Sequence, residues 1–179
     1  MAAHSSVASW TNVMIRPEQP GDRDAVRALN ERAFGGREEA DIVEALHRAQ
    51  AAVVALVAER GGHVVGHILF SPVGVEGANA TRLVGLAPMA VAPEHQRQGL
   101  GTQLAHQGLA LCTSAGVGGV VVLGHAEYYP RFGFVPAAQF GLRCEYDVPA
   151  DVFMALELSP GALRDVSGLV RYHQAFAKV

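Results

Sequence analysis

The sequence predicts a single α/β domain (α+β) with one mixed, mostly antiparallel central sheet and flanking helices. The chain has 179 residues, which suits one domain with a well-buried core and is short for two. Apolar residues make up 50% and charged residues 17% of the chain, which argues against a disordered protein. Apolar residues recur with helical spacing, then along a run of strands, and then in a strand, helix, strand order.

The N-terminal segment of the domain predicts a strand followed by two helices. Val13 to Arg16 is a short apolar strand that Pro17 ends. Pro20-Gly21-Asp22 offers a turn and an N-cap, and apolar residues then recur with helical spacing as far as Gly35-Gly36. A second amphipathic helix runs from Glu38 to about Ala49.

Three strands in succession predict an antiparallel meander. They are Ala52 to Glu59, His63 to about Val75, and Arg82 to Val91. The turns between them are Arg60-Gly61-Gly62 and Gly77 to Ala80.

A strand, helix, strand unit completes the pattern and predicts a parallel pair of strands. Gly99 to Ser114 has the spacing of a helix, and Gly118 to Leu123 is uniformly apolar, as expected of a central strand. Shorter elements follow: helical turns from Glu127 to Arg131, a short strand at Phe134-Val135 and a final strand from Val152 to Leu158. The tail from Ser159 to Val179 shows no clear period. We expect a flexible N-terminal extension over residues 1–13 and a single domain over residues 14–179.

Charge, cysteine content and hydropathy narrow the class of protein. The formal net charge of −3 gives no global attraction to nucleic acid or to an anionic membrane. The longest wholly apolar run, Ala51 to Ala58, is far shorter than the ~20 residues of a membrane span, and the first 13 residues lack the features of a secretory signal. Cys112 and Cys144 stand apart without a CxxC pattern, which is typical of a cytoplasmic protein with reduced thiols.

The loop that leads into the Gly99 helix carries the clearest functional signal. It contains Gly99 and Gly101, which allow a ligand to approach the backbone, and the first-turn amides of the helix favour a phosphate group. A Walker loop would need Lys-Ser or Lys-Thr after the last glycine, and a Rossmann turn would need a third glycine. The loop therefore indicates a pyrophosphate site of another kind, with an ordinary strand-to-helix connection as the alternative.

Two motifs together resemble the GNAT superfamily of N-acetyltransferases. Gln96-x-x-Gly99-x-Gly101, directly after a Met-Ala-Val-Ala-Pro strand, resembles the acyl-coenzyme A loop of that superfamily. About thirty residues on, Tyr128-Tyr129-Pro130-Arg131-Phe132-Gly133-Phe134 resembles its Tyr-x-x-x-Gly-Phe signature. The resemblance covers about Met14 to Leu158 and is greatest to the YhbS-like branch of acetyltransferases.

The resemblance implies a fold, a donor and a reaction. The fourth and fifth strands would splay apart to admit the pantetheine arm of acetyl-CoA, and the reaction would be direct transfer of the acetyl group to an acceptor amine of a small molecule, peptide or protein. The backbone of the fourth strand would pair with the arm, and loop amides would hold the pyrophosphate. The residues implied in cofactor binding are Met89, Ala90, Val91, Gln96, Arg97, Gln98, Gly99, Leu100, Gly101 and Thr102. The protein would act as a monomer or homodimer.

Two side chains are candidates for catalysis. Tyr129, four residues before Gly133, matches the general acid of the superfamily, and a phenol with a pKa near 10 is protonated at neutral pH. The adjacent Tyr128 is one position out of register and is better explained by packing. His125, at the end of the fifth strand, is a candidate proton relay, with a role in capping the next helical turns as the alternative.

The general base is not defined by the sequence. Members of the superfamily often carry a glutamate on the fourth strand, whereas Arg82 to Val91 contains no acidic residue. A water chain to His125, to Glu127 or to a backbone carbonyl, or an acceptor that arrives neutral, would replace it. Because the fourth strand lacks this carboxylate, a non-catalytic acyl-CoA sensor is the alternative function.

The sequence gives weaker indications about the acceptor pocket and about metal binding. The first two helices and the region from Gln139 to Asp147 would surround the acceptor. The first-turn acids Glu38, Glu39 and Asp41 either attract a cationic amine or only complement the helix dipole. No metal is expected, since His63 and His67 would lie ~13 Å apart along a strand and no other histidines form a cluster.

Overall fold

The structure is a computed structural model that describes residues 12–178. It contains a nine-stranded sheet in which β1-β2-β3-β4-β5-β8-β6 form a continuous path, and β9 pairs with β3 and β7. The strands are β1 (Val13–Pro17), β2 (Val54–Arg60), β3 (His63–Val75), β4 (Ala78–Val91), β5 (Gly119–Leu123), β6 (Val135–Pro136), β7 (Leu142–Cys144), β8 (Phe153–Glu157) and β9 (Gly168–Arg171). Residues 1–11 of the expected N-terminal extension lie outside the described residues.

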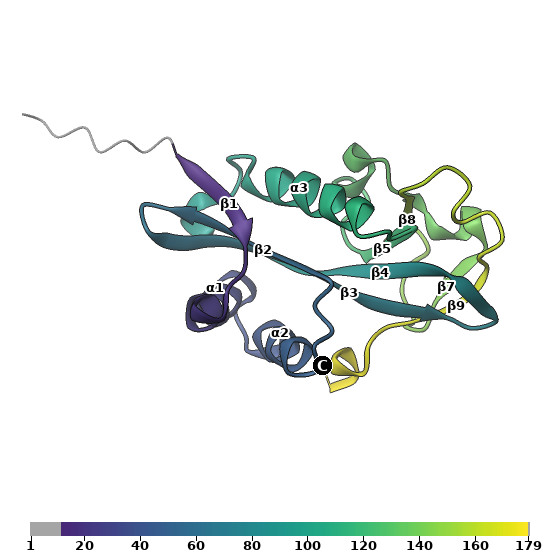
Figure 1. Ribbon diagram of the computed structural model, residues 1–179, viewed down its shortest axis with the longest axis horizontal. Coiled ribbons are helices and arrows are strands. Elements are labelled where there is room, and N and C mark those ends of the chain that lie inside the picture. The colour runs from purple at the N-terminus through teal and green to yellow at the C-terminus, as the bar shows by residue number, and fades with distance from the viewer. Residues whose placement is uncertain (1–11, 179) are drawn as a thin grey trace, which may run out of the picture.

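Three α-helices cover the two faces of the sheet. They are α1 (Arg23–Phe34), α2 (Glu38–Arg48) and α3 (Leu100–Ser114). Figure 1 shows α3 on one face and α1 with α2 on the other. Short 3₁₀ helices connect the larger elements: η1 (Pro20–Asp22), η2 (Pro93–His95), η3 (Tyr129–Phe132), η4 (Ala137–Phe140) and η5 (Gln174–Lys178).

The predicted mixed, mostly antiparallel sheet is confirmed. The meander β2-β3-β4 pairs antiparallel, and β4 and β5 pair parallel on either side of α3, as the strand, helix, strand pattern predicts. The bounds of β3 coincide with the expected strand. Gly35, with φ of 77°, ends α1 where the glycine pair predicts it.

Two expectations need correction. The turn after β3 occupies Glu76-Gly77, because Val75 pairs with Ala78, and β4 therefore begins earlier than the expected Arg82. The tail without a clear period contains β9 and η5, so the strand at Phe153–Glu157 is not the last. The η5 segment returns to lie beside α2 (Figure 1).

The two central strands β4 and β5 separate after a short stretch of pairing. Only Leu83–Gly85 of β4 pairs with β5, at Gly119–Val121. Beyond Gly85, β4 continues to Val91 with β3 as its partner, through a register shift between Ile68 and Phe70. The far half of β4 therefore has an edge that β5 leaves uncovered, as expected of a splay between the fourth and fifth strands.

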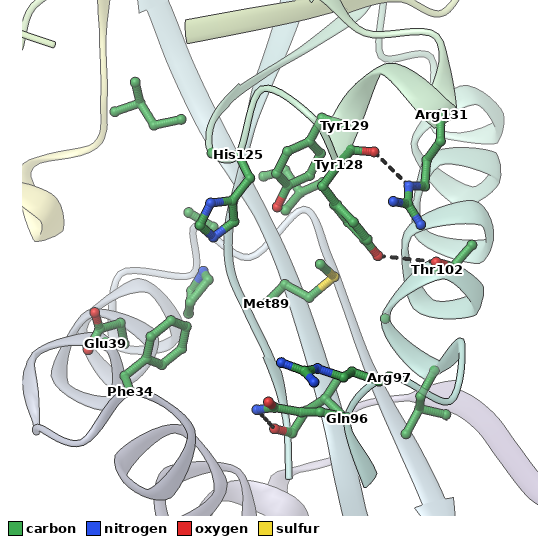
Figure 2. Close-up of a pocket in the computed structure, with 18 of the residues that line it drawn as sticks. Phe34, Glu39, Met89, Gln96, Arg97, Thr102, His125, Tyr128, Tyr129 and Arg131 are labelled. Atoms are coloured by element: carbon green, nitrogen blue, oxygen red, sulfur yellow. Dashed lines mark hydrogen bonds between the residues drawn. The ribbon is translucent and has the colours of Figure 1, made fainter. Parts of the chain in front are cut away.

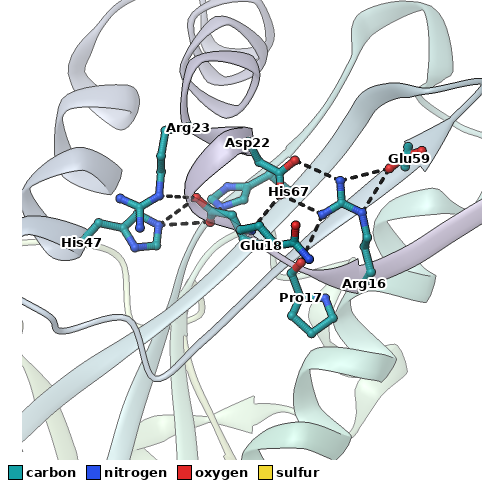
Figure 3. A network of polar contacts seen from close by, with 9 residues as sticks. Arg16, Pro17, Glu18, Asp22, Arg23, His47, Glu59 and His67 are labelled. Atoms are coloured by element: carbon teal, nitrogen blue, oxygen red, sulfur yellow. Dashed lines mark hydrogen bonds and ion pairs between the residues drawn. The ribbon is translucent and has the colours of Figure 1, made fainter.

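A buried polar network ties α1 and α2 to the sheet on the face opposite α3. The Glu18 side chain is only 1% exposed, and its carboxylate accepts from Nε2 of His67 on β3 at 2.9 Å and from Nε2 of His47 on α2 at 3.0 Å. Arg23 at the start of α1 adds an ion pair at 3.1 Å. Beside it, Arg16 makes a bidentate pair with Asp22 (Figure 3).

Candidate active site

A cavity of about 910 Å³ lies where β4 and β5 separate. One wall is the far half of β4, with Leu86, Ala87, Pro88, Met89 and Val91. A second is the following loop and the start of α3, with His95, Gln96, Arg97, Gly99, Leu100, Gly101 and Thr102. A third is the end of β5 with η3, and it contributes Leu123, Gly124, His125, Tyr128, Tyr129 and Arg131. The last wall is formed by Phe34, Glu39, Ile42 and Phe176.

The β4 wall offers free backbone groups to the cavity. The Ala92 amide donates to the Val65 carbonyl of β3 at 2.9 Å, and Ala90 is paired with His67. Since hydrogen-bonding groups alternate along an antiparallel strand, the N–H and C=O groups of Met89 and Val91 point away from β3, toward the open edge. The Val91 carbonyl there accepts from Nε2 of Gln96 at 3.0 Å, which holds the loop against the strand.

The loop before α3 has the conformation of an anion-binding turn. Arg97 has φ of 61° and Gly99 has φ of 81°, so two left-handed residues precede the helix closely. Alternation of this kind directs successive backbone amides toward one point. The first intrahelical bond runs from the Gln103 amide to the Gly99 carbonyl at 3.1 Å, which leaves the preceding amides of the first turn without helical partners.

Tyr129 contributes a buried phenol with a free hydroxyl. Its side chain packs edge-on against Tyr128 and Phe134, and the residue is 8% exposed. No hydrogen bond to its hydroxyl occurs within residues 12–178, and the ring lines the cavity. Burial, together with the nearby Tyr128, raises the pKa of Tyr129 to about 12. The phenol therefore keeps its proton throughout the physiological range.

Tyr128 has a different, structural arrangement. Its hydroxyl lies 3.2 Å from Oγ1 of Thr102, and the guanidinium of Arg131 stacks over its ring at 4.2 Å. The two tyrosine hydroxyls thus diverge, with that of Tyr128 directed to α3 (Figure 2). Tyr128 joins η3 to the start of α3, in agreement with the packing role expected of it.

The backbone and the side chain of His125 lie in different surroundings. Its carbonyl accepts from the amides of Tyr128 at 3.0 Å and Tyr129 at 3.4 Å, so its backbone begins the turn that leads into η3. Its side chain is exposed, lines the cavity and has no hydrogen-bond partner in the described part of the chain. Figure 2 shows its ring on the same side of the cavity as Tyr129.

The structure brings together most, but not all, of the residues expected in the site. Ala90 and Gln98 do not line the cavity: Ala90 is buried against β3, and Gln98 contacts the Glu94 carbonyl and Arg60. Glu127, one of the fallback bases, is exposed and lies outside the cavity wall. Sequence reasoning missed Phe176, because the tail that carries it gives no periodic signal.

Residues 12–178 lack features of two other classes of protein. The described residues contain no group of three or more His, Cys, Asp or Glu side chains placed to hold a metal ion. None of the described helices has the length and apolar character required to cross a bilayer.

The parallel strands β4 and β5 separate beside the N-terminus of α3, and the buried phenol of Tyr129 lines the opening between them. Comparison with known proteins names the class. The Acetyltransferase (GNAT) family matches residues 23–134. The chain belongs to this family.

The similar proteins include bacterial acetyltransferases over nearly the whole chain. The Escherichia coli protein called "Uncharacterized N-acetyltransferase YhbS" is 39% identical over 165 residues, covering 92% of this chain and 98% of that protein. The crystal structure of E. coli YhbS in complex with CoA has a TM-score of 0.88 at 38% identity, with 92% of each chain covered. A GNAT acetyltransferase from Brucella melitensis, crystallised with acetyl-CoA, has a TM-score of 0.78 at 38% identity, over 92% of this chain and 98% of that one.

Proposed function

We propose that the protein transfers the acetyl group of acetyl-CoA directly to an acceptor amine, with Tyr129 as the proton donor. The observation that carries this proposal is the cavity between β4 and β5, which unites a free strand edge, the amides of α3 and an unpaired phenol. Family membership and the CoA and acetyl-CoA complexes of the similar acetyltransferases support the choice of donor.

The residues present fit acetyl-CoA in two ways. Met89 and Val91 would bind the pantetheine amides as an added strand does, through backbone groups that β3 does not use. The first-turn amides of Leu100, Gly101 and Thr102 would bind the pyrophosphate, with Arg97 supplying positive charge from the same wall. Backbone amides would therefore supply the attraction for an anion that the net charge of −3 does not supply.

The chemistry requires proton transfer and stabilisation of negative charge. Acetyl-CoA supplies an activated thioester that a neutral amine can attack. A backbone amide on the open edge of β4 would donate to the thioester oxygen as that oxygen gains charge. Tyr129 would give its proton to the departing thiolate, since its raised pKa keeps the phenol protonated.

His125 is the side chain best placed to accept the proton of the acceptor. It lies on the cavity wall next to η3, whereas Glu127 lies outside the wall. A water molecule between the amine and the imidazole would complete the relay. The assignment agrees with the absence of a carboxylate on the far half of β4.

The proposal is tested by incubating the protein with acetyl-CoA and a panel of amines. Free thiol is measured over time, and mass spectrometry identifies the acetylated amine. Acetylated product that requires both protein and acetyl-CoA supports the proposal. Binding of acetyl-CoA without acetylation across the panel would instead favour the alternative function, a non-catalytic acyl-CoA sensor. A melting temperature that acetyl-CoA does not raise would contradict both functions.

A further inference from the structure

Charges of both signs line the cavity, and they come from different elements. Arg97 lies on the loop before α3 and Arg131 lies on η3, beside the walls proposed to hold the coenzyme. Glu39, from the first turn of α2, is the one carboxylate among the described residues that line the cavity. Figure 2 shows Glu39 beside Phe34, with Met89 between this pair and the tyrosines.

Glu39 differs from the other acids of its turn. Asp41 is held by Arg27 at 2.7 Å, and Glu38 is exposed and does not line the cavity. Glu39 is half-buried and makes no hydrogen bond or ion pair to any residue between 12 and 178. Complementing the helix dipole is a role that all three acids share, so it does not account for the placement of Glu39 on the cavity wall.

Apolar side chains surround the carboxylate. Phe34 at the end of α1 is 45% exposed, and Ile42 lies one turn beyond Glu39 on α2. Phe176 reaches the same wall from η5, which packs against α2 through Ala175. The family match ends at residue 134, so this part of the wall comes from a segment outside it. An apolar surface with one carboxylate suits a ligand with an apolar body and a single cationic group.

We infer that this wall, formed by Phe34, Glu39, Ile42 and Phe176, is the acceptor subsite and that it takes a small straight-chain diamine. One amine is acetylated beside Tyr129 and His125, the hydrocarbon chain lies on the apolar side chains, and the second ammonium pairs with Glu39. The inference rests on the proposed function, which places the reacting amine beside Tyr129 and His125. The transfer forms the amide bond to one nitrogen, breaks the thioester bond and leaves the thiol protonated.

Calorimetry on the protein saturated with CoA tests the subsite independently of turnover. Cadaverine is the probe, and n-pentylamine is its control with one charge. We expect cadaverine to bind the wild type at least fivefold more tightly than pentylamine does, a difference equivalent to roughly 1 kcal/mol. Glu39→Gln should abolish that preference. Glu38→Gln, which removes a charge from the same helical turn outside the cavity, should retain it.

Any result other than these would contradict the assignment of the acceptor subsite. Equal binding of the two amines, no binding of either, or a preference that survives in Glu39→Gln would each show that Glu39 does not select a second positive charge. Loss of the preference in Glu38→Gln as well would show a general effect of charge on α2. Because none of these measurements requires acetyl transfer, failure of the subsite is distinguishable from failure of the proposed function, which the thiol and mass assays report.

Discussion

Gly124 lies against the ring of Tyr129 so closely that a Cβ at Gly124 would overlap the ring atom Cε2. The contact links the residue that follows β5 to the first residue of η3 and restricts the position of the phenol ring. Tyr128 and Phe134 pack edge-on against the same ring. The direction of the Tyr129 hydroxyl is therefore set by packing alone, since no hydrogen bond to it occurs among the described residues.

Gly124→Ala tests whether this packing positions the phenol. The new methyl group must displace the Tyr129 ring, and small displacements of a catalytic group are costly, so we expect kcat to fall by about 10- to 100-fold. Acetyl-CoA affinity should change little. Gly74→Ala is the matched control, because a Cβ at Gly74 would meet no heavy atom within 4 Å. A Gly124→Ala variant with wild-type kcat would remove this contact from the mechanism.

Gly99→Ala tests the conformation of the loop before α3. Gly99 has φ of 81°, and a residue with a side chain pays about 1–2 kcal/mol for a left-handed conformation. The substituted loop should relax in the free protein, so that binding must restore its shape. We expect the Kd for CoA to rise about fivefold, measured by calorimetry. An unchanged Kd would mean that the loop amides do not hold the pyrophosphate.

The fold could be predicted from the sequence where pairing is local. Helices α1, α2 and α3 and the meander are marked by caps, glycine turns and apolar spacing within a few residues. The strands β7 and β9 were missed because they are short and their partners are distant in the chain: Val170 pairs with Val75 and Cys144. Phe176 was missed as a cavity residue for the same reason.

The candidate site could be predicted in part. The loop glycines and Tyr129 belong to motifs whose residues are close together in the chain. The sequence was therefore sufficient to predict them as site residues, and all of them line the cavity. The three acids at the start of α2 could not be separated by sequence, since each of them complements the helix dipole. Only the packing of α1, α2 and η5 distinguishes Glu39 from the other two.

The Glu18 network predicts a loss of stability in acid. Burial opposes ionisation of Glu18, but hydrogen bonds from His47 and His67 outweigh it and lower the pKa from 4.5 to about 2. A carboxyl group with a depressed pKa in the folded state contributes stability that is fully present above pH 4.5 and lost as the pH falls toward 2. The contribution is about 3 kcal/mol.

Glu18→Gln should therefore lower the free energy of unfolding at neutral pH by an amount of that order, measured by urea denaturation. The variant should also lose the part of the acid dependence that lies between pH 4.5 and 2. Glu127→Gln, at an exposed position, is the control and should behave as the wild type. An acid dependence that is identical in Glu18→Gln and the wild type would show that the network does not hold this carboxylate ionised.

The dependence of turnover on pH follows from the raised pKa of Tyr129. A proton donor with a pKa of about 12 stays protonated up to that pH, so Tyr129 imposes no decline in rate at lower pH. We expect kcat/KM to rise with pH as the acceptor amine loses its proton and to show no descending limb up to pH ~10. A descending limb near neutrality that disappears in Tyr129→Phe would show that the phenol titrates far below this value.

Turnover of Tyr129→Phe is the most direct test of the central claim, that Tyr129 donates the proton in an acetyl transfer from acetyl-CoA. The ring and its packing remain in this variant, and only the hydroxyl is removed. We predict that kcat falls by about 10²-fold or more while the Kd for CoA stays within about twofold, because general acid catalysis contributes roughly 10²–10⁴-fold. Tyr146→Phe, at an exposed tyrosine outside the cavity, should retain wild-type values for both. A Tyr129→Phe enzyme with unchanged kcat would contradict the account.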